Sequence, residues 1–198
     1  MTLLEEVPTE AFRELSIPVL ETERLLLRPY ADTDFAGLHD IYSRPDVVRY
    51  LYEQPRSEEN VRAMIAERLD NVALVKSGDY LSLVVALPDD PDTPIGTAML
   101  NWVSEEHAHA EVGYTLHPDH QGKGYATELT RALVDLGFRE TDVHRITGRL
   151  DARNTASLRV LEKSGMRVEA HLVENEFVKG EWQSELIFAI LRSEWSRT

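Results

Sequence analysis

A glycine-rich run in the middle of the chain precedes a strongly amphipathic segment. The run QGKGYA occupies positions 121–126, and Ala126, Leu129, Leu133 and Leu136 then recur at helical spacing. Glycines let the backbone approach a ligand closely, and the start of a helix presents unpaired N–H groups and a positive dipole end to an anion. The pattern predicts a phosphate-binding turn. A tight strand-to-helix turn with an exposed lysine explains GKG alone equally well.

Two common phosphate motifs do not fit this run. A P-loop needs glycine where His117 stands and Ser or Thr where Gly124 stands. A dinucleotide fingerprint needs glycine or alanine at Thr127. The ligand therefore has to be inferred from other residues.

A second cluster lies about thirty residues further on, where Asn154 and Ser157 are followed by Glu162-Lys163 and Gly165. With this pair of motifs the sequence resembles the GNAT superfamily of acetyl-CoA-dependent N-acetyltransferases. Gln121, Gly124 and Ala126 match the family's pyrophosphate signature, and the second cluster matches its downstream signature, with Met166 in place of the aromatic residue. Ser157 and the Glu-Val-Gly-Tyr at 111–114 look most like the RimJ/RimL-type branch, which acetylates N-termini of ribosomal proteins.

The resemblance covers nearly all but the first 18 residues and implies an α/β GNAT fold. That fold has a mixed, mostly antiparallel central sheet of about six to seven strands, flanked by about four helices. It also implies acetyl-CoA as co-substrate, direct transfer to an amine and no metal. The expected donor site consists of the end of a strand, the glycine-rich turn and the next helix start: Tyr114, Thr115, Leu116, Gln121, Gly122, Lys123, Gly124, Tyr125, Ala126, Thr127, Asn154 and Ser157.

An amine must lose a proton before it attacks a thioester, so a base is required. Glu111 is the first candidate, because it precedes Tyr114 in the central strand, where the family often places a carboxylate facing the cleft. A solvated strand carboxylate in an acidic protein is the alternative.

Ser157 is the candidate for stabilising or protonating the leaving thiolate. Many family members use a tyrosine seven residues after the asparagine, and Leu161 stands there in this chain. A local bond from the Ser157 hydroxyl to the backbone is the alternative role, and Asn154 is a good N-cap with or without a ligand.

His107, His109 and Glu111 alternate and so share one strand face, which superficially suggests a metal site. We do not expect one, because nothing else supplies a second cluster of ligands. His109 could assist as a base.

The elements that must position these residues can be traced by periodicity. Three apolar segments, residues 80–87, 95–102 and 108–116, predict an antiparallel meander, and residues 145–151 predict a short strand. Helices are expected to follow Asp32, Ser57, Gly124 and Asn154. Segments 166–177 and 182–191 predict a final hairpin that turns at Lys179–Gly180. We expect residues 1–18 to form an N-terminal arm and residues 19–198 a single domain.

Composition narrows the function further. The chain has 198 residues, no cysteine, 21 Lys+Arg and 35 Asp+Glu, with a formal net charge of −14. The negative electrostatic field of such a chain repels phosphate backbones, which argues against nucleic-acid binding and favours cationic, amine-bearing acceptors. The absence of cysteine excludes a thiol nucleophile and disulfides. Without a membrane span or a signal peptide, a cytoplasmic location is expected.

The sequence thus predicts an acetyl-CoA:amine N-acetyltransferase whose acceptor could be a protein or peptide N-terminus. The alternatives are a small-amine enzyme, acting on a polyamine, an amino acid or an aminoglycoside, and an inactive acyl-CoA-binding sensor. Acceptor choice is expected to reside in residues 32–77 and 174–183. An exposed terminal strand could allow a homodimer.

Overall fold

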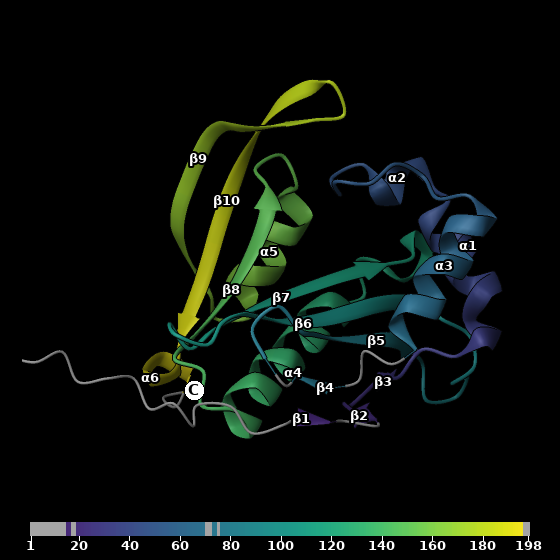
Figure 1. Cartoon of the computed structure of the whole chain (residues 1–198), viewed down its shortest axis with the longest axis horizontal. Coiled ribbons are helices and arrows are strands. Elements are labelled where there is room, and N and C mark those ends of the chain that lie inside the picture. Colours follow the sequence, from purple (N-terminus) through teal and green to yellow (C-terminus); the bar gives the residue numbers. More distant parts are fainter. Residues whose placement is uncertain (1–14, 17–18, 70–72, 75, 196–198) are drawn as a thin grey trace, which may run out of the picture.

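The computed structural model describes residues 15–16, 19–69, 73–74 and 76–195. The main sheet has eight strands in the order β2-β3-β5-β6-β7-β8-β10-β9 (Figure 1), and a separate pair joins β1 (Leu15–Ser16) to β4 (Ala73–Leu74). The expected mixed α/β fold is confirmed, with one strand more than predicted. Apart from Leu15–Ser16, the N-terminal arm lies outside the described residues, and its boundary stays a prediction.

The predicted meander is present and forms the middle of the sheet. It consists of β5 (Tyr80–Ala86), β6 (Gly96–Ser104) and β7 (His109–Leu116), all antiparallel. β3 (Leu26–Arg28) pairs with β5, and β2 (Leu20–Glu21) pairs with β3. On β5, Leu81, Leu83 and Val85 face one hydrophobic core, while Val84 faces a second. Both faces of the sheet are therefore covered.

Helices on the two faces have different roles. The helices α1 (Phe35–Tyr42), α2 (Pro45–Val48) and α3 (Glu58–Arg68) enclose the smaller core. The larger core lies under α4 (Tyr125–Glu140) and α5 (Thr155–Lys163) and extends to α6 (Arg192–Trp195). In the part of the chain that the structure describes, no helix is long and apolar enough to span a bilayer.

One expected helix start is wrong. Asp32 does not cap α1, because a 3-10 turn covers Asp32–Asp34 and α1 begins at Phe35. Asp34 accounts for this difference: it is fully buried, accepts the Ala31 N–H at 2.8 Å and forms a bidentate pair with Arg28. By contrast, Ser57 caps α3 as predicted, since its side chain accepts the Asn60 N–H.

The feature that creates a site is the parting of two parallel strands. β7 and β8 (Arg145–Asp151) pair only at their beginnings, from His109 opposite Arg145 to Glu111 opposite Thr147. Beyond that point β7 continues beside β6, while β8 continues beside β10 (Glu181–Leu191), so the strands diverge (Figure 1). Backbone edges that a sheet would normally pair are thus exposed inside the fold.

The last hairpin reaches past the opening. It joins β9 (Arg167–Val178) to β10 through the predicted turn at Lys179–Gly180, and both turn residues have positive φ, +53° and +87°. β9 is the last strand of the main sheet. The tip of this hairpin lies on the same side as α2 (Figure 1).

Candidate active site

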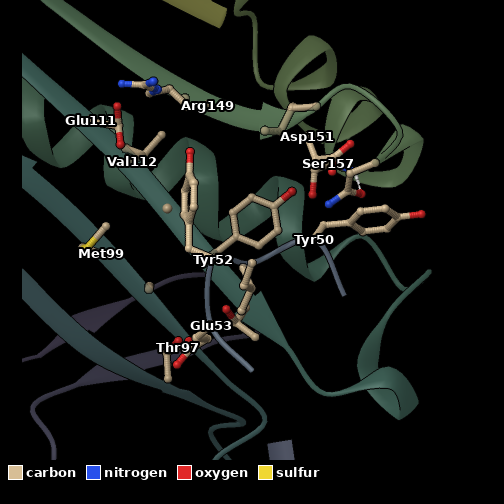
Figure 2. Close-up of a pocket in the computed structure, with 18 of the residues that line it drawn as sticks. Tyr50, Tyr52, Glu53, Thr97, Met99, Glu111, Val112, Arg149, Asp151 and Ser157 are labelled. Atoms are coloured by element: carbon tan, nitrogen blue, oxygen red, sulfur yellow. Dashed lines mark hydrogen bonds between the residues drawn. The ribbon is translucent and has the colours of Figure 1, made fainter. Parts of the chain in front are cut away.

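A cavity of about 450 Å³ fills the opening between β7 and β8. Figure 2 shows Glu111 and Arg149 on one side of it and Asp151 and Ser157 on the other. We call it the splay cavity. Its walls come from the separated strands, from α5, from the segment that follows α2 and from the last hairpin: among others Thr97, Met99, Glu111–Thr115, Gly148–Asp151, Asn154, Ser157, Leu161, Tyr42, Tyr50–Glu53, Arg68 and Glu176.

The glycine-rich turn has the backbone geometry expected of an anion site. Gly122 and Gly124 have φ of +73° and +86°, which side chains with a Cβ rarely adopt. Gly124 precedes α4, whose first N–H groups, at Tyr125, Ala126 and Thr127, have no partner within the helix. The turn can therefore hold a pyrophosphate at the positive end of α4.

Gln121 and Leu116 join this turn to the end of β7. The Gln121 side chain donates to the Leu116 carbonyl at 3.0 Å, while Lys123 is exposed on the turn. From Val112 onward, the edge of β7 that faces away from β6 has no paired strand in the described ranges. Backbone groups at Tyr114 and Thr115 can therefore pair with the amides of an extended ligand, as an added strand would.

Arg24 also contributes to the turn, and sequence reasoning missed it. Its guanidinium donates to the Lys123 carbonyl at 3.0 Å and forms an ion pair with Glu128 at 2.6 Å. It also lies over the Tyr125 ring at 5.0 Å. Burial alone would raise the pKa of Glu128, but hydrogen bonds from Thr22 and Arg24 hold it below the usual value. Because Arg24 is 99 residues from Lys123, no local pattern indicated the contact.

Glu111 lies at the point where β7 and β8 separate, facing the splay cavity. It is half-buried, and burial raises the pKa of its carboxyl, with Glu185 acting in the same direction. The Arg149 charge and the Thr147 hydroxyl act the other way. A half-buried carboxylate with a raised pKa inside a cavity has the properties of a general base.

Arg149 connects Glu111 to a second acid. It forms a bidentate pair with Glu185, with both N···O distances 2.7 Å, and Glu185 is buried. The charge on Arg149 is thus directed mainly at Glu185, and it acts on Glu111 as a nearby positive charge.

His109 lies beside this group, as its alternation with Glu111 predicts. Its Nε2 is 2.8 Å from the Thr147 hydroxyl, and burial lowers its pKa. Among the described residues, no three His, Asp or Glu side chains are grouped closely enough to hold a metal ion.

Asn154 and Ser157 begin α5 at the opposite wall. The Asn154 side chain accepts the Ser157 N–H at 3.1 Å, so the predicted N-cap role is confirmed. In the described residues the Ser157 hydroxyl does not bond to the backbone of its helix, and the residue lines the splay cavity. Its cofactor contact stays a prediction.

The aromatic residues differ in whether they reach the cavity. Trp102 is buried in the core and Trp182 is exposed on the hairpin, whereas Tyr114 does line the cavity. Tyr50 and Tyr52, which sequence reasoning missed, come from the segment after α2 (Figure 2). Their spacing in YLYE, two apart, carried no recognisable motif.

Two hydrogen bonds cross from the segment around α2 to the last hairpin. The Tyr52 hydroxyl donates to Glu176 Oε2 at 2.6 Å, and Lys179 Nζ donates to the Val48 carbonyl at 2.6 Å. The regions expected to choose the acceptor, 32–77 and 174–183, thus meet at the cavity.

Comparison with known proteins assigns the family. The model of the acetyltransferase (GNAT) domain matches residues 24–167. YnaD of Bacillus subtilis, an uncharacterized N-acetyltransferase, is 30% identical over 89% of this chain and 99% of its own. A GNAT-family acetyltransferase from Bacillus anthracis of known structure is also 30% identical, with a TM-score of 0.79, over 88% of this chain and 99% of that one.

The chain therefore belongs to the GNAT family of acetyltransferases. It is an acyltransferase that uses acetyl-CoA as co-substrate and an amine-bearing acceptor. A further relative, spermidine N(1)-acetyltransferase of Vibrio cholerae, is 25% identical over 87% of this chain and 95% of its own.

Proposed function

We propose that this enzyme acetylates a small polycationic amine, with spermidine-like amines as the substrate class. The observation that carries the proposal is the charge of the splay cavity: Glu53, Glu111, Asp151 and Glu176 line it, against Arg68 and Arg149. An acidic cavity attracts cations and, in a chain of net charge −14, so does the surrounding surface. The similarity to a spermidine acetyltransferase supports the same class.

Not all of these carboxylates are equally available to an acceptor. Asp151 is paired with Arg153 at 2.6 Å, and Glu53 is paired with Arg56. Glu176, by contrast, receives a hydrogen bond from the neutral Tyr52 hydroxyl. Glu176 lines the cavity from the last hairpin, at what we call its mouth, and Glu111 lies where β7 and β8 separate, at what we call its apex. These two carboxylates could thus act on two nitrogens of one acceptor.

The enclosure of the cavity favours a small acceptor over a protein. The bond from Tyr52 to Glu176 joins two residues that line the cavity from different elements, and the cavity of about 450 Å³ must also hold the acetyl end of the donor. A slim aliphatic amine fits such an opening more readily than a folded polypeptide. The RimJ/RimL-type acceptor, a protein or peptide N-terminus, is the competing proposal, and the Ser157 motif favours it.

In the proposed mechanism Glu111 accepts the proton of the attacking amine. Its raised pKa brings it closer to the working pH, where proton acceptance is most efficient. A backbone N–H on the free edge of β7 stabilises the oxyanion, a contribution whose loss typically costs about 10²–10³ in rate. The turn at Gln121–Thr127 and the start of α4 hold the pyrophosphate of acetyl-CoA.

The test is release of free CoA from acetyl-CoA, followed with a thiol reagent, in the presence of three matched acceptors. These are spermidine, a monoamine of the same length with an uncharged tail, and a short peptide with a free N-terminus. We expect kcat/KM for spermidine to exceed that for the monoamine by at least about tenfold, because a second ammonium pairs with Glu176 and is also attracted by the other carboxylates of the cavity. Faster turnover of the peptide than of spermidine would overturn the proposal in favour of the N-terminal acetyltransferase.

A further inference from the structure

Two hydroxyl groups of the splay cavity come from opposite walls. Tyr114 comes from β7 and Ser157 from the first turn of α5, and both line the cavity. The Tyr114 ring packs against the larger core, while its hydroxyl oxygen is buried without a hydrogen-bond partner of normal geometry in the described residues. A buried polar group without a partner is rare in a folded protein and needs an explanation.

The Ser157 side chain is close enough to the Tyr114 hydroxyl to influence its pKa. Burial raises the pKa of Tyr114 to about 12, and the neighbouring Ser157 hydroxyl acts in the opposite direction. The phenol therefore keeps its proton at any working pH and can donate it in a hydrogen bond. Ser157 itself is held in place because its N–H binds the Asn154 side chain at 3.1 Å.

Part of this wall is apolar. Leu161, one turn further along α5, is 3% exposed, and a Cβ built on Gly148 would lie 3.0 Å from its Cδ1. Beside these apolar residues, α5 and β7 present the hydroxyls of Ser157 and Tyr114 to the cavity. Under the proposed function, on which this inference rests, the donor thioester lies in this cavity beside the two hydroxyls.

We propose that Tyr114 is a positioning residue for the leaving group: when the donor is bound, its phenol donates a hydrogen bond to Ser157 Oγ, which turns the Ser157 hydroxyl hydrogen toward the sulfur of the thioester. A hydroxyl oriented in advance stabilises the charge that develops on sulfur without having to reorganise during the reaction.

The step balances without a proton leaving Tyr114. The amine nitrogen forms a bond to the acetyl carbon, the C–S bond breaks, and its electron pair stays on sulfur. The proton of the amine goes to the Glu111 carboxylate, which later releases it to solvent. The thiolate accepts the hydrogen bond from Ser157 and takes its proton from solvent, giving CoA and the acetylated amine.

The primary test measures the thiol of CoA while it is bound, and so needs no acceptor. The probe is CoA itself, titrated from neutral to alkaline pH and followed by the ultraviolet absorbance of the thiolate. On the wild-type enzyme we expect more thiolate at a given pH than in free CoA. On Tyr114→Phe we expect about tenfold less thiolate than on the wild type, because the Ser157 hydroxyl is no longer oriented to donate its hydrogen bond to the charged sulfur. Affinity for CoA at neutral pH, where the thiol is mostly protonated, should be unchanged.

The matched control is Tyr80→Phe, which deletes a phenol hydroxyl that binds Glu67 at 2.7 Å outside the splay cavity. It should leave the titration of bound CoA unaltered. The inference would be overturned if the fraction of CoA thiolate at each pH were the same on the wild type and on Tyr114→Phe. It would also be overturned if that fraction were the same for bound and free CoA. Because the readout involves no amine, an error in the proposed acceptor would not affect it.

A second measurement separates positioning from a structural role. With the best acceptor of the panel, Tyr114→Phe should lower kcat about tenfold and leave the KM for acetyl-CoA unchanged. The double variant with Ser157→Ala should be no slower than Ser157→Ala alone, because Tyr114 acts through Ser157. The proposal would be contradicted if the loss of kcat in the double variant equalled the product of the losses in the two single variants. A change in the KM alone would also contradict it. Thermal stability of the enzyme without donor should not fall, since in that state the removed hydroxyl has no partner of normal geometry.

Discussion

Glu111 on β7 stands opposite Thr147 on β8 in the last register pair before the two strands part. This pair places a carboxylate at the apex of the splay cavity, where one side is still sheet and the other is open. Burial there raises the pKa of Glu111, and Arg149 and Thr147 keep that rise limited. The divergence of two strands thus creates both the cavity and the basicity of its carboxylate.

The first prediction concerns Glu111 itself. Glu111→Gln keeps the shape of the side chain and removes its ability to accept a proton, so kcat should fall about 10²–10⁴-fold. Calorimetric affinity for acetyl-CoA should be unchanged. Glu106→Gln, on the exposed turn between β6 and β7, is the matched control and should retain full turnover. Wild-type turnover in Glu111→Gln would remove this residue from the mechanism.

The second prediction is the pH dependence that follows from burial of Glu111. A carboxylate acts as a base only when it is ionised. The value of kcat/KM should therefore be highest above the raised pKa of Glu111 and should fall as the pH falls through that pKa. Arg149→Gln removes a charge that lowers this pKa, so the acidic limb of the profile should move to higher pH. Arg149→Lys keeps the charge and should leave the limb nearly in place. A limb that stays fixed in Arg149→Gln would mean that another group titrates.

Local patterns were sufficient to predict most of the fold. The meander, the glycine turn before α4 and the turn at Lys179–Gly180 depend on alternation, on positive φ and on caps within a few residues. The N-cap bond from Ser157 N–H to Asn154 is local in the same sense. These are the elements in which periodicity and backbone conformation carry the information.

The contacts that complete the site could not be predicted in this way. Tyr52 meets Glu176 across 124 residues, and Arg24 reaches the turn at Lys123 across 99. Both depend on tertiary packing, which no spacing in the sequence encodes. Asp34 shows the same limit on a smaller scale, since burial with Arg28, and not capping propensity, decides where α1 begins.

The third prediction tests that buried pair. Asp34 is fully buried and binds the Arg28 guanidinium at 2.5 and 2.9 Å. Asp34→Asn leaves a partly buried positive charge without its partner, which should cost about 3–5 kcal/mol of unfolding free energy. Asp32→Asn, in the same turn, should cost much less. Urea unfolding followed by tryptophan fluorescence measures both, and equal midpoints would contradict the assignment.

The fourth prediction separates backbone strain from ligand binding at the glycine turn. Gly124→Ala and Gly180→Ala both place a Cβ at a positive φ, +86° and +87°, and each should cost about 1–2 kcal/mol of stability. In Gly124→Ala the new Cβ would also lie 3.3 Å from Arg24 Nη2, beside the proposed pyrophosphate site. CoA affinity should therefore fall about tenfold in Gly124→Ala and stay unchanged in Gly180→Ala. Equal affinities in the two variants would place the pyrophosphate elsewhere.

The fifth prediction uses the two ends of one hydrogen bond at the mouth of the splay cavity. The Tyr52 hydroxyl donates to Glu176, and burial together with this carboxylate raises the pKa of Tyr52, so the hydroxyl stays protonated. A polyamine nitrogen would have to compete with that hydroxyl for Glu176. Tyr52→Phe keeps the ring and frees the carboxylate, so the KM for spermidine should fall, whereas Glu176→Gln removes the charge and should raise it. Because the bond lies at an exposed site, each change should be about two- to fivefold.

The uncharged-tail monoamine provides the control for this pair of variants, because it has no second ammonium for Glu176 to bind. Its KM should be the same in the wild type, in Tyr52→Phe and in Glu176→Gln. If both variants instead raise the KM for spermidine, the bond from Tyr52 to Glu176 holds the cavity in shape and Glu176 is not the partner of the distal nitrogen. Opposite changes for spermidine, with none for the monoamine, assign the distal nitrogen to Glu176 and the reacting nitrogen to the apex at Glu111.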